Sequence, residues 1–176
     1  YHNVAGSWVQ IGSDINGESQ GDQSGYSVSL SSDGSIVAIG AIGNDGNGAD
    51  AGHVRVYHNV AGSWVQIGSD INGEAAIDQS GYSVSLSDDG ATLAIGARFN
   101  DGNGSESGHV RLYQNVGGSW SQIGSDINGE AADDLSGYSV SLSSDGATLA
   151  IGAIYNDGAG SQSGHVRVYK FVGGAW

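Results

Sequence analysis

The chain has 176 residues, among them 32 glycines but no proline, cysteine or methionine. Nineteen acidic residues against five basic ones give a formal charge of −14, which opposes binding to nucleic acid and to anionic membrane surfaces. The lack of cysteine excludes disulfides and thiolate metal sites. No apolar run reaches the ~20 residues of a membrane-spanning helix, and the chain starts without an initiator methionine, so we expect a processed or partial chain.

Short strands joined by tight turns are expected, because glycine reaches positive φ without steric cost. The first predicted strand is Trp8–Ile11. In the next, Tyr26–Leu30, apolar residues alternate with serine, which predicts one apolar face. Asp33-Gly34 follows, and this dipeptide favours a hairpin because both residues tolerate positive φ.

Three more strands follow in chain order. The run Val37–Ile39 is continuously apolar, as in a strand covered on both faces. In His53–Tyr57, apolar residues alternate with His53 and Arg55, which we place on a polar face. After a glycine turn, Trp64–Ile67 forms the last strand of the unit.

This four-stranded unit repeats with a strict period of 56 residues. Repeated antiparallel units of this kind predict an all-β fold of β-propeller blades. A β-solenoid is the alternative, but its coils are usually shorter. We expect a single repeat domain, with an outer strand and connector at 1–24, blade repeats at 25–80 and 81–136, and a partial blade lacking its outer strand at 137–176.

Three blades cannot close a propeller ring. We therefore expect self-association through the open blade edges, in a head-to-tail dimer whose six blades are completed by strand exchange. The last eight residues match the pattern of the first eight. This overlap is superfluous in a closed ring, so the alternative that the chain is a piece of a longer array stays open.

The units resemble the FG-GAP repeats of integrin-α-type propellers along the whole chain. The matching segments in the first unit are Gly25–Val28, Ala38–Ala41 and Gly52–Tyr57. The resemblance implies that the first strand is innermost and the tryptophan strand outermost, and that the protein acts in adhesion or ligand recognition outside the cell or at its surface. Calcium-binding members carry several carboxylates in the first hairpin, whereas Ser31–Gly34 offers one, so that calcium site is not carried over.

An acidic connector precedes each blade. Its oxygen-bearing side chains stand at relative positions one, three, five and nine, a spacing similar to that of calcium loops. The glycine is misplaced for an EF-hand, however, and a solvated connector whose carboxylates cap turns is the alternative. The candidate Ca²⁺ ligands are Asp14, Asn16, Glu18, Asp22, Asp70, Asn72, Glu74, Asp78, Asp126, Asn128, Glu130 and Asp134.

A polar loop after the second strand begins with Asn-Asp-Gly in each repeat, and its sequence varies just beyond. We expect a plain hairpin loop rather than a calcium-binding nonapeptide turn, because those turns function as tandem arrays. Variable loops can line a ligand surface. The candidate ligand residues here are Asp45, Asn47, Asp101, Asn103 and Asp157.

One histidine per repeat, at His53, His109 and His165, is expected to pair with a neighbouring carboxylate, because no second metal ligand stands near it in the sequence. The tryptophans are expected to seal the seams between blades, with sugar stacking as the alternative.

We expect no enzyme, because near-identical blades offer only the same residues in the same surroundings and no nucleophile motif is present. The favoured function is a binding or adhesion module that presents repeated surfaces to glycan or protein ligands. The alternatives are a purely structural, self-assembling propeller block and, less favoured, a glycan-active enzyme using paired carboxylates.

Overall fold

The computed structural model describes residues 2–176, and this part of the chain is built from strands and turns without helix. It accordingly contains no helix long and apolar enough to cross a membrane. The strands are β1 (His2–Val4), β2 (Ser7–Val9), β3 (Ser24–Leu30), β4 (Ile36–Ala41), β5 (His53–Val60), β6 (Ser63–Gln66), β7 (Ile71–Asn72), β8 (Ser83–Leu86), β9 (Thr92–Ala97), β10 (His109–Val116), β11 (Ser119–Gln122), β12 (Ile127–Asn128), β13 (Ser136–Leu142), β14 (Thr148–Ala153) and β15 (His165–Lys170).

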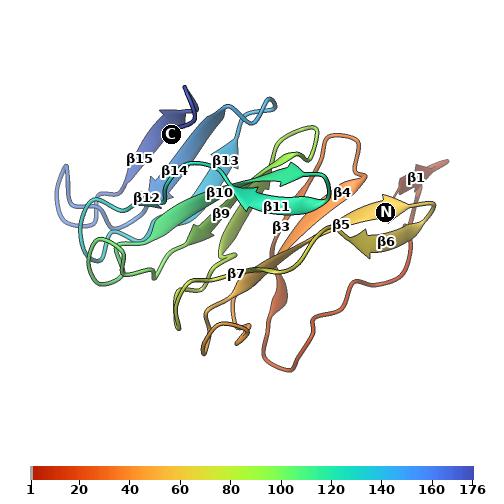
Figure 1. The fold of residues 1–176 in the computed structure, drawn as a ribbon, viewed down its shortest axis with the longest axis horizontal. Helices are drawn as coiled ribbons and strands as arrows, with labels where there is room; N and C mark the ends of the chain where they lie inside the picture. The colour runs from red at the N-terminus through yellow and green to blue at the C-terminus, as the bar shows by residue number, and fades with distance from the viewer. Residues whose placement is uncertain (1) are drawn as a thin grey trace.

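Three antiparallel sheets follow one another along the chain (Figure 1). The first has the order β3-β4-β5-β6, with the short β7 also paired to β5. The second repeats this order in β8 to β12, and the third contains β13, β14 and β15. Within each sheet the longer strands thus pair in sequence order, whereas the short β7 and β12 pair with the third strand of their sheet. The predicted all-β architecture of repeated antiparallel units is confirmed, and we call the three sheets blades 1, 2 and 3.

The hairpin between the first two strands of each blade depends on one residue with positive φ rather than two. Gly34 has a φ of +70°, whereas Asp33 is not among the residues with positive φ. The Asp33 carboxylate instead accepts hydrogen bonds from the Ser35 amide at 2.9 Å and the Ser31 hydroxyl at 2.7 Å. The predicted hairpin is observed, with positive φ at the glycine alone, and the aspartate stabilises the turn through its side chain.

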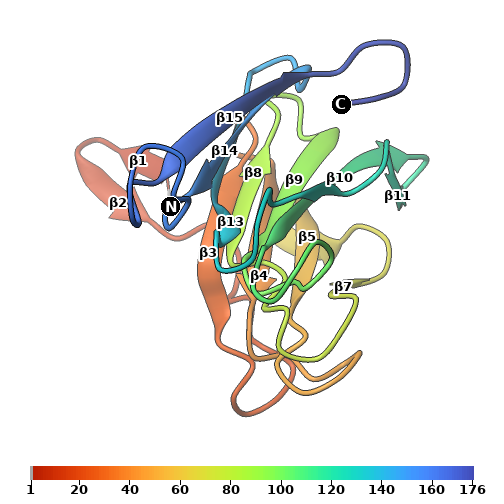
Figure 2. The ribbon, with the colours of Figure 1, turned by 90° about the vertical axis from the view of Figure 1, so that its left-hand side faces the viewer.

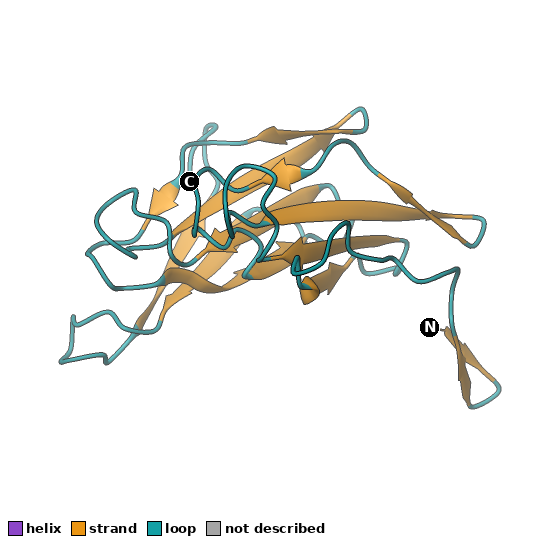
Figure 3. Cartoon of the chain, turned by 90° about the horizontal axis from the view of Figure 1, so that it is seen from below, coloured by secondary structure: helices purple, strands orange, loops and turns teal. Residues whose placement is uncertain are grey.

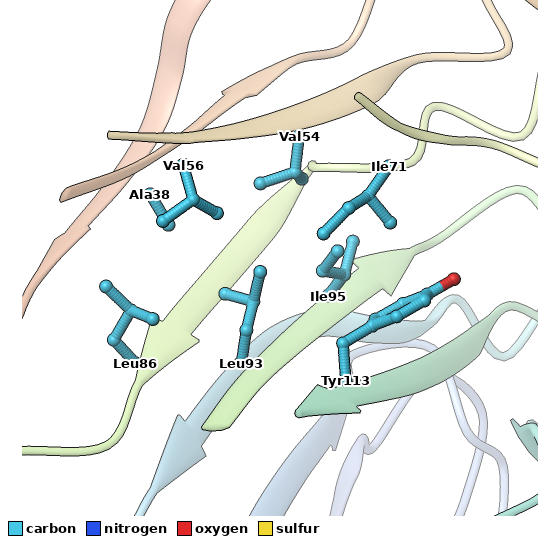
Figure 4. Close-up of a cluster of buried hydrophobic side chains, with 8 residues drawn as sticks. All are labelled: Ala38, Val54, Val56, Ile71, Leu86, Leu93, Ile95 and Tyr113. Atoms are coloured by element: carbon cyan, nitrogen blue, oxygen red, sulfur yellow. The ribbon is translucent and has the colours of Figure 1, made fainter. Parts of the chain in front are cut away.

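Apolar side chains from facing blades interlock between them. Residues of β4, β5 and β7 in blade 1 meet residues of β8, β9 and β10 in blade 2 (Figure 4). The second strand supplies side chains to both of its faces, as its continuous apolar run predicted. The cluster contains Ala38, Val54, Val56, Ile71, Leu86, Leu93, Ile95 and Tyr113. A corresponding cluster joins blades 2 and 3.

The strand backbones of neighbouring blades approach closely at glycines of the second strand. A Cβ on Gly40 would meet the carbonyl oxygen of Gly81 in blade 2, and a Cβ on Gly96 would meet that of Gly137 in blade 3. Glycine is therefore required where these blades touch.

The first strands of successive blades lie next to one another. The rings of Tyr26, Tyr82 and Tyr138 form a ladder across them, with centroids 5.0 Å apart at each step. In the middle of the ladder, the Arg98 guanidinium lies 3.9 Å from the Tyr82 ring centroid. The three blades are thus arranged side by side around their first strands, as in a segment of a propeller (Figure 2).

The two ends of this segment are open. Within residues 2–176, no blade covers the face of blade 1 that carries Val28 or the face of blade 3 that carries Val168, and both valines are exposed. The hairpin of β1 and β2 projects away from the three sheets and is exposed along its length (Figure 3).

Candidate functional site

Two clusters of one histidine and two carboxylates occur one repeat apart. In residues 2–176 these are the groups in which three metal-ligating side chains come together. The first contains Glu18, His53 and Asp70, with one ligand atom of each within 4.8 Å of the others.

The pairing of β5 with β7 explains how the first cluster forms. His53 is the first residue of β5 and pairs with Asn72, and Val54 pairs with Ile71. Asp70, which precedes β7, therefore lies diagonal to His53 on the same face of the sheet. The acidic connector before blade 1 brings Glu18 to this face, where its Oε2 lies 3.9 Å from Nδ1 of His53.

The second cluster repeats the first in blade 2 and contains Glu74, His109 and Asp126. The distance between Oε2 of Glu74 and Nδ1 of His109 is 3.6 Å. Both histidines are 1% exposed, whereas both glutamates are about 40% exposed. Each cluster thus joins a buried imidazole to a carboxylate that solvent can reach.

An arginine lies beside the glutamate in each cluster. Nη1 of Arg55 is 3.5 Å from Oε1 of Glu18, and Nη1 of Arg111 is 3.7 Å from Oε1 of Glu74. The other terminal nitrogen donates a 2.7 Å hydrogen bond to a connector carbonyl, from Arg55 to Asn16 and from Arg111 to Asn72. These arginines are buried, so they hold the connector against the blade and offset one negative charge of the cluster.

Burial keeps the imidazoles neutral at physiological pH. Desolvation lowers the pKa of His109 to about 4, with the Arg111 charge acting in the same direction. Desolvation also lowers the pKa of His53. It raises the pKa of the Glu74 carboxyl. A neutral imidazole beside two carboxylates is the form that binds metal ions.

The sequence placed His53 and Arg55 on a polar, solvent-facing side of the strand. Both residues do lie beside carboxylates on one face, but the connector covers that face and buries both of them rather than leaving them in solvent. The expected pairing of each histidine with a carboxylate is observed, and it extends to His165 and Glu130, whose Nδ1 and Oε2 are 3.5 Å apart. In residues 2–176 no third metal-ligating side chain joins these two, so this group has two members.

The predicted calcium ligands of one connector do not come together at a single site. Glu18 and Glu74 enter the clusters, and Asp70 and Asp126 enter from the connector that follows the blade. The sequence spacing of these ligands therefore does not describe how they come together.

The last aspartate of each connector is buried and joins the connector to the polar loop of the next blade. Asp78 accepts hydrogen bonds from the Ala75 amide and from Nδ2 of Asn100, both at 3.0 Å. Asp22 and Asp134 make the corresponding bonds in the other repeats. The first aspartate instead accepts a bond from a nearby glutamine, as Asp14 does from Gln10 at 2.8 Å.

The candidate ligand residues of the polar loops bind their own loop or the next connector. Asp45 accepts a hydrogen bond from the Asp50 amide at 2.9 Å, and Asp101 and Asp157 act alike in their loops. The Asn47 amide donates to the carbonyls of Gly73 and Glu74 at 2.8 and 3.0 Å. Asn103 makes the equivalent bonds to the Gly129 and Glu130 carbonyls. The asparagines thereby position the glutamates that face the histidines.

A shallow pocket lies beside each of two tryptophans, Trp64 and Trp120, against the connector before its blade. The pocket of about 320 Å³ beside Trp64 is lined by Asp14, Asn16 and Tyr57, among others, and an equivalent pocket of about 310 Å³ lies beside Trp120. The indole of Trp64 donates a 2.9 Å hydrogen bond to the carbonyl of Ile11. This bond ties the tryptophan to the connector before blade 1, and the sealing of a seam between blades by Trp64 stays a prediction.

A model of the FG-GAP repeat family matches residues 16–57, 72–113 and 128–169. These segments make up more than half of the chain, one in each repeat. The chain belongs to the FG-GAP repeat family. Each FG-GAP segment begins in the acidic connector and ends in the third strand of a blade. The first two segments therefore include the glutamate and the histidine of one cluster each, and the third includes Glu130 and His165.

Solved structures share the fold of these FG-GAP repeats at low sequence identity. A 6-phosphogluconolactonase from Bacteroides uniformis, described as putative in its own structure report, has a TM-score of 0.55 at 15% identity, over 83% of this chain and 36% of its own. Hydrazine synthase from Kuenenia stuttgartiensis has a TM-score of 0.54 at 11% identity, over 93% and 36%. A periplasmic gluconolactonase from Pseudomonas aeruginosa has a TM-score of 0.53 at 18% identity, over 89% and 41%. No curated protein matches the chain.

The FG-GAP chain spans about two fifths or less of these structures, and identities below 25% show the fold alone. The expectation that the protein is not an enzyme is nevertheless contradicted, because two of the structures that share its fold are named as lactonases. None of the three is named as an adhesion protein. Adhesion, an extracellular location and calcium binding stay predictions.

Sequence reasoning missed the histidine–carboxylate clusters because their members are far apart in the chain. Glu18 precedes His53 by 35 residues and Asp70 follows it by 17. A search for acidic residues that recur with the same 56-residue period as the histidine would have named the candidates. Only the pairing of β5 with β7 and the path of the connector select among them.

Proposed function

We propose that the protein is a propeller building block that assembles with a second copy of itself through its two open blade faces. One observation carries this proposal. Val28 and Leu30 on the open face of blade 1 are 63% and 58% exposed, whereas Leu86, one repeat after Leu30, is 7% exposed against blade 1. Large apolar side chains gathered on one face favour an interaction surface.

The opposite open face has the complementary property. Val166 and Val168 on β15 are 66% and 68% exposed, whereas Val110 and Leu112, one repeat earlier, are at most 1% exposed beneath blade 3. The face of blade 3 thus carries the side chains that cover a following blade, and the face of blade 1 carries those that a preceding blade covers. A second copy offers the missing partner for each face.

Hydrogen bonds between neighbouring blades also repeat from one blade contact to the next. The Ser27 hydroxyl donates to the Gly81 carbonyl at 2.6 Å, and Ser83 donates to Gly137 at 2.8 Å. In the assembly, Ser139 would donate to the Gly25 carbonyl of the second copy. This head-to-tail contact is heterologous, so it closes into a six-bladed ring if the blade rotation permits and otherwise continues as an open array.

Light scattering of the purified chain over a range of concentrations tests the proposal. We expect a mass of twice 17.7 kDa for the ring, and monomers for Val168→Glu, since the charge would be buried in the contact. Val116→Glu is the matched control, because Val116 is also exposed but lies on the middle blade. A wild-type monomer at high concentration would refute the assembly, and a ladder of larger masses would refute ring closure.

Hydrolysis of a sugar lactone is a second candidate, supported by the names of two of the structures that share the fold. The observation that favours it is the contact of a carboxyl whose pKa is raised, Glu74, with an imidazole whose pKa is lowered, His109. Such groups can exchange a proton and are typical of catalytic sites. Acid release from glucono-1,5-lactone should exceed the spontaneous rate and fall in Glu18→Gln/Glu74→Gln. Equal rates with and without the protein would exclude this candidate.

A further inference from the structure

We infer that the two clusters Glu18–His53–Asp70 and Glu74–His109–Asp126 each bind a divalent transition-metal ion, with Zn²⁺ as the ion that fits best. The inference goes beyond assembly and depends neither on ring formation nor on lactone hydrolysis. It rests on the donor set, on a buried nitrogen atom without a partner in the first cluster, and on the way the surrounding residues hold the carboxylates.

The donor set is that of a zinc site with an open position. Each cluster offers one imidazole nitrogen and two carboxylate oxygens, all within 4.8 Å of one another. Zn²⁺ is bound by three such protein ligands, with water in the fourth position, in many sites that exchange ligands. Ca²⁺ prefers six to eight oxygen ligands, which these clusters do not supply. Because one of the three ligands is an imidazole, the clusters should bind a transition-metal ion in preference to Ca²⁺.

The histidines provide an observation independent of the acidic residues. Nδ1 of His53 is buried and has no hydrogen-bond partner, although Oε2 of Glu18 lies 3.9 Å from it. In the second cluster Nδ1 of His109 lies 3.6 Å from Oε2 of Glu74, whereas the unpartnered buried nitrogen of this ring is Nε2, so the argument from an unpaired nitrogen applies to the first cluster. Buried polar atoms are rarely left unpaired, because each costs the free energy of its lost hydration. An ion between the imidazole and the carboxylates would satisfy the nitrogen that faces them.

The carboxylates are held in place before any ion arrives. Asp70 accepts a 2.7 Å hydrogen bond from Gln66, and Asp126 accepts one of 2.7 Å from Gln122. Asn47 fixes the backbone of Glu74 through its carbonyl. Partners of this kind orient metal ligands and raise affinity.

Replacing the arginine beside a cluster should raise the affinity for the metal ion, whereas replacing a ligand should lower it. Arg111 lies 3.7 Å from Glu74, and its positive charge repels a cation at the same carboxylate. Arg111→Gln should therefore tighten binding at the second cluster, whereas a merely structural ion pair predicts no such gain.

Isothermal titration of the chelator-treated full chain with Zn²⁺ alone tests the inference, with Co²⁺ absorption in the visible as a second readout. We expect two ions per chain. Binding should weaken by at least about tenfold in Glu18→Gln/Glu74→Gln, since even loss of a residue that only orients a ligand costs that much. Both glutamates are about 40% exposed, so this variant should fold, which its thermal transition would verify.

Two matched control variants distinguish binding at the clusters from nonspecific attraction of Zn²⁺ to an acidic surface. Asp14 occupies the position of Asp70 one repeat earlier and accepts the same glutamine bond, but it has no histidine beside it. Glu130 faces His165 without a third ligand. Asp14→Asn and Glu130→Gln should each leave the two ions and their affinity unchanged. Binding of Zn²⁺ that persists in Glu18→Gln/Glu74→Gln, or no binding by the wild type, would overturn the inference.

Discussion

Two equivalent sheet faces, one repeat apart, lie in different surroundings. Blade 1 covers this face of blade 2, whereas the corresponding face of blade 1 is open. Leu86 in the middle of the molecule is 7% exposed, whereas Leu30, its equivalent one repeat earlier, is 58% exposed. Both end the first strand of a blade and both precede an Asp-Gly hairpin. The difference shows that burial in a repeat protein depends on the neighbouring repeat as well as on the sequence of the residue's own repeat.

The largest expected effect is the difference between truncating these two leucines. Leu86→Ala should lower the free energy of unfolding by about 2–5 kcal/mol, because it leaves a cavity between blades 1 and 2. Leu30→Ala should change it by about 0.5 kcal/mol or less in the monomer. Urea unfolding at low protein concentration measures both. Equal losses there would contradict the open end face, whereas a loss that grows with concentration for Leu30→Ala would reflect assembly.

A second comparison uses the glycines at the blade contacts. A Cβ on Gly96 would meet the Gly137 carbonyl of the next blade as well as the Ser83 hydroxyl, whereas a Cβ on Gly152 would meet only the equivalent Ser139 hydroxyl at close range. Gly96→Ala should therefore destabilise the monomer by about 1–3 kcal/mol more than Gly152→Ala, since overpacking forces the blades apart.

Thermal unfolding of the two alanine variants, at the same concentration, measures this difference. In an assembled ring a following blade would cover Gly152, so the gap between the variants should shrink as dimers form. A gap that is absent at every concentration would mean that the blades do not touch at Gly96.

The smallest expected difference concerns a local feature, the aspartate of the first hairpin. A bond from the Ser35 amide, followed by one from the Ser31 hydroxyl, lowers the pKa of Asp33 to about 2. The Ser87 hydroxyl and the Ala91 amide lower the pKa of Asp89 in the same way. A lowered pKa in the folded state stabilises the fold above pH ~3.8, and this stabilisation is lost as the pH falls toward the folded value.

Asp33→Asn and Asp89→Asn should therefore destabilise the protein by similar amounts at pH 7 and by little near pH 2. The two positions should agree although one is in an end blade and the other in the middle, because their partners lie within the same turn. Urea midpoints at both pH values provide the measurement. A markedly larger loss for Asp89→Asn would show that the neighbouring blade also supports this turn.

The local elements were predictable because their causes are local. Alternation in Tyr26–Leu30, the apolar run Val37–Ile39 and the Asp-Gly hairpin predicted the first two strands of each blade. The short β7 was missed, because Ile71–Asn72 is only two residues long and is fixed by its pairing with the start of β5. No periodicity can be detected over so short a segment.

The candidate site was only partly predictable. Glu18 and Asp70 stood among the candidate ligands, and His53 was expected to pair with a carboxylate. Their meeting was missed, because it depends on a connector that folds back over β5 and on a strand pairing between residues far apart in sequence. The role of Asp78 as a buried link to Asn100 was missed for the same reason.

The sequence by itself determined the repeat, the strands and hairpins within it, and the apolar strand faces that must be covered. Periodic side chains and turn residues act over a few positions, so their effects can be seen in the sequence. Only the tertiary structure decided which of these faces are covered, which glycines touch another backbone, and which carboxylates face a buried histidine. Those outcomes depend on contacts between segments that lie roughly a third of a repeat or more apart, and the free energy of such contacts comes from packing and desolvation in three dimensions.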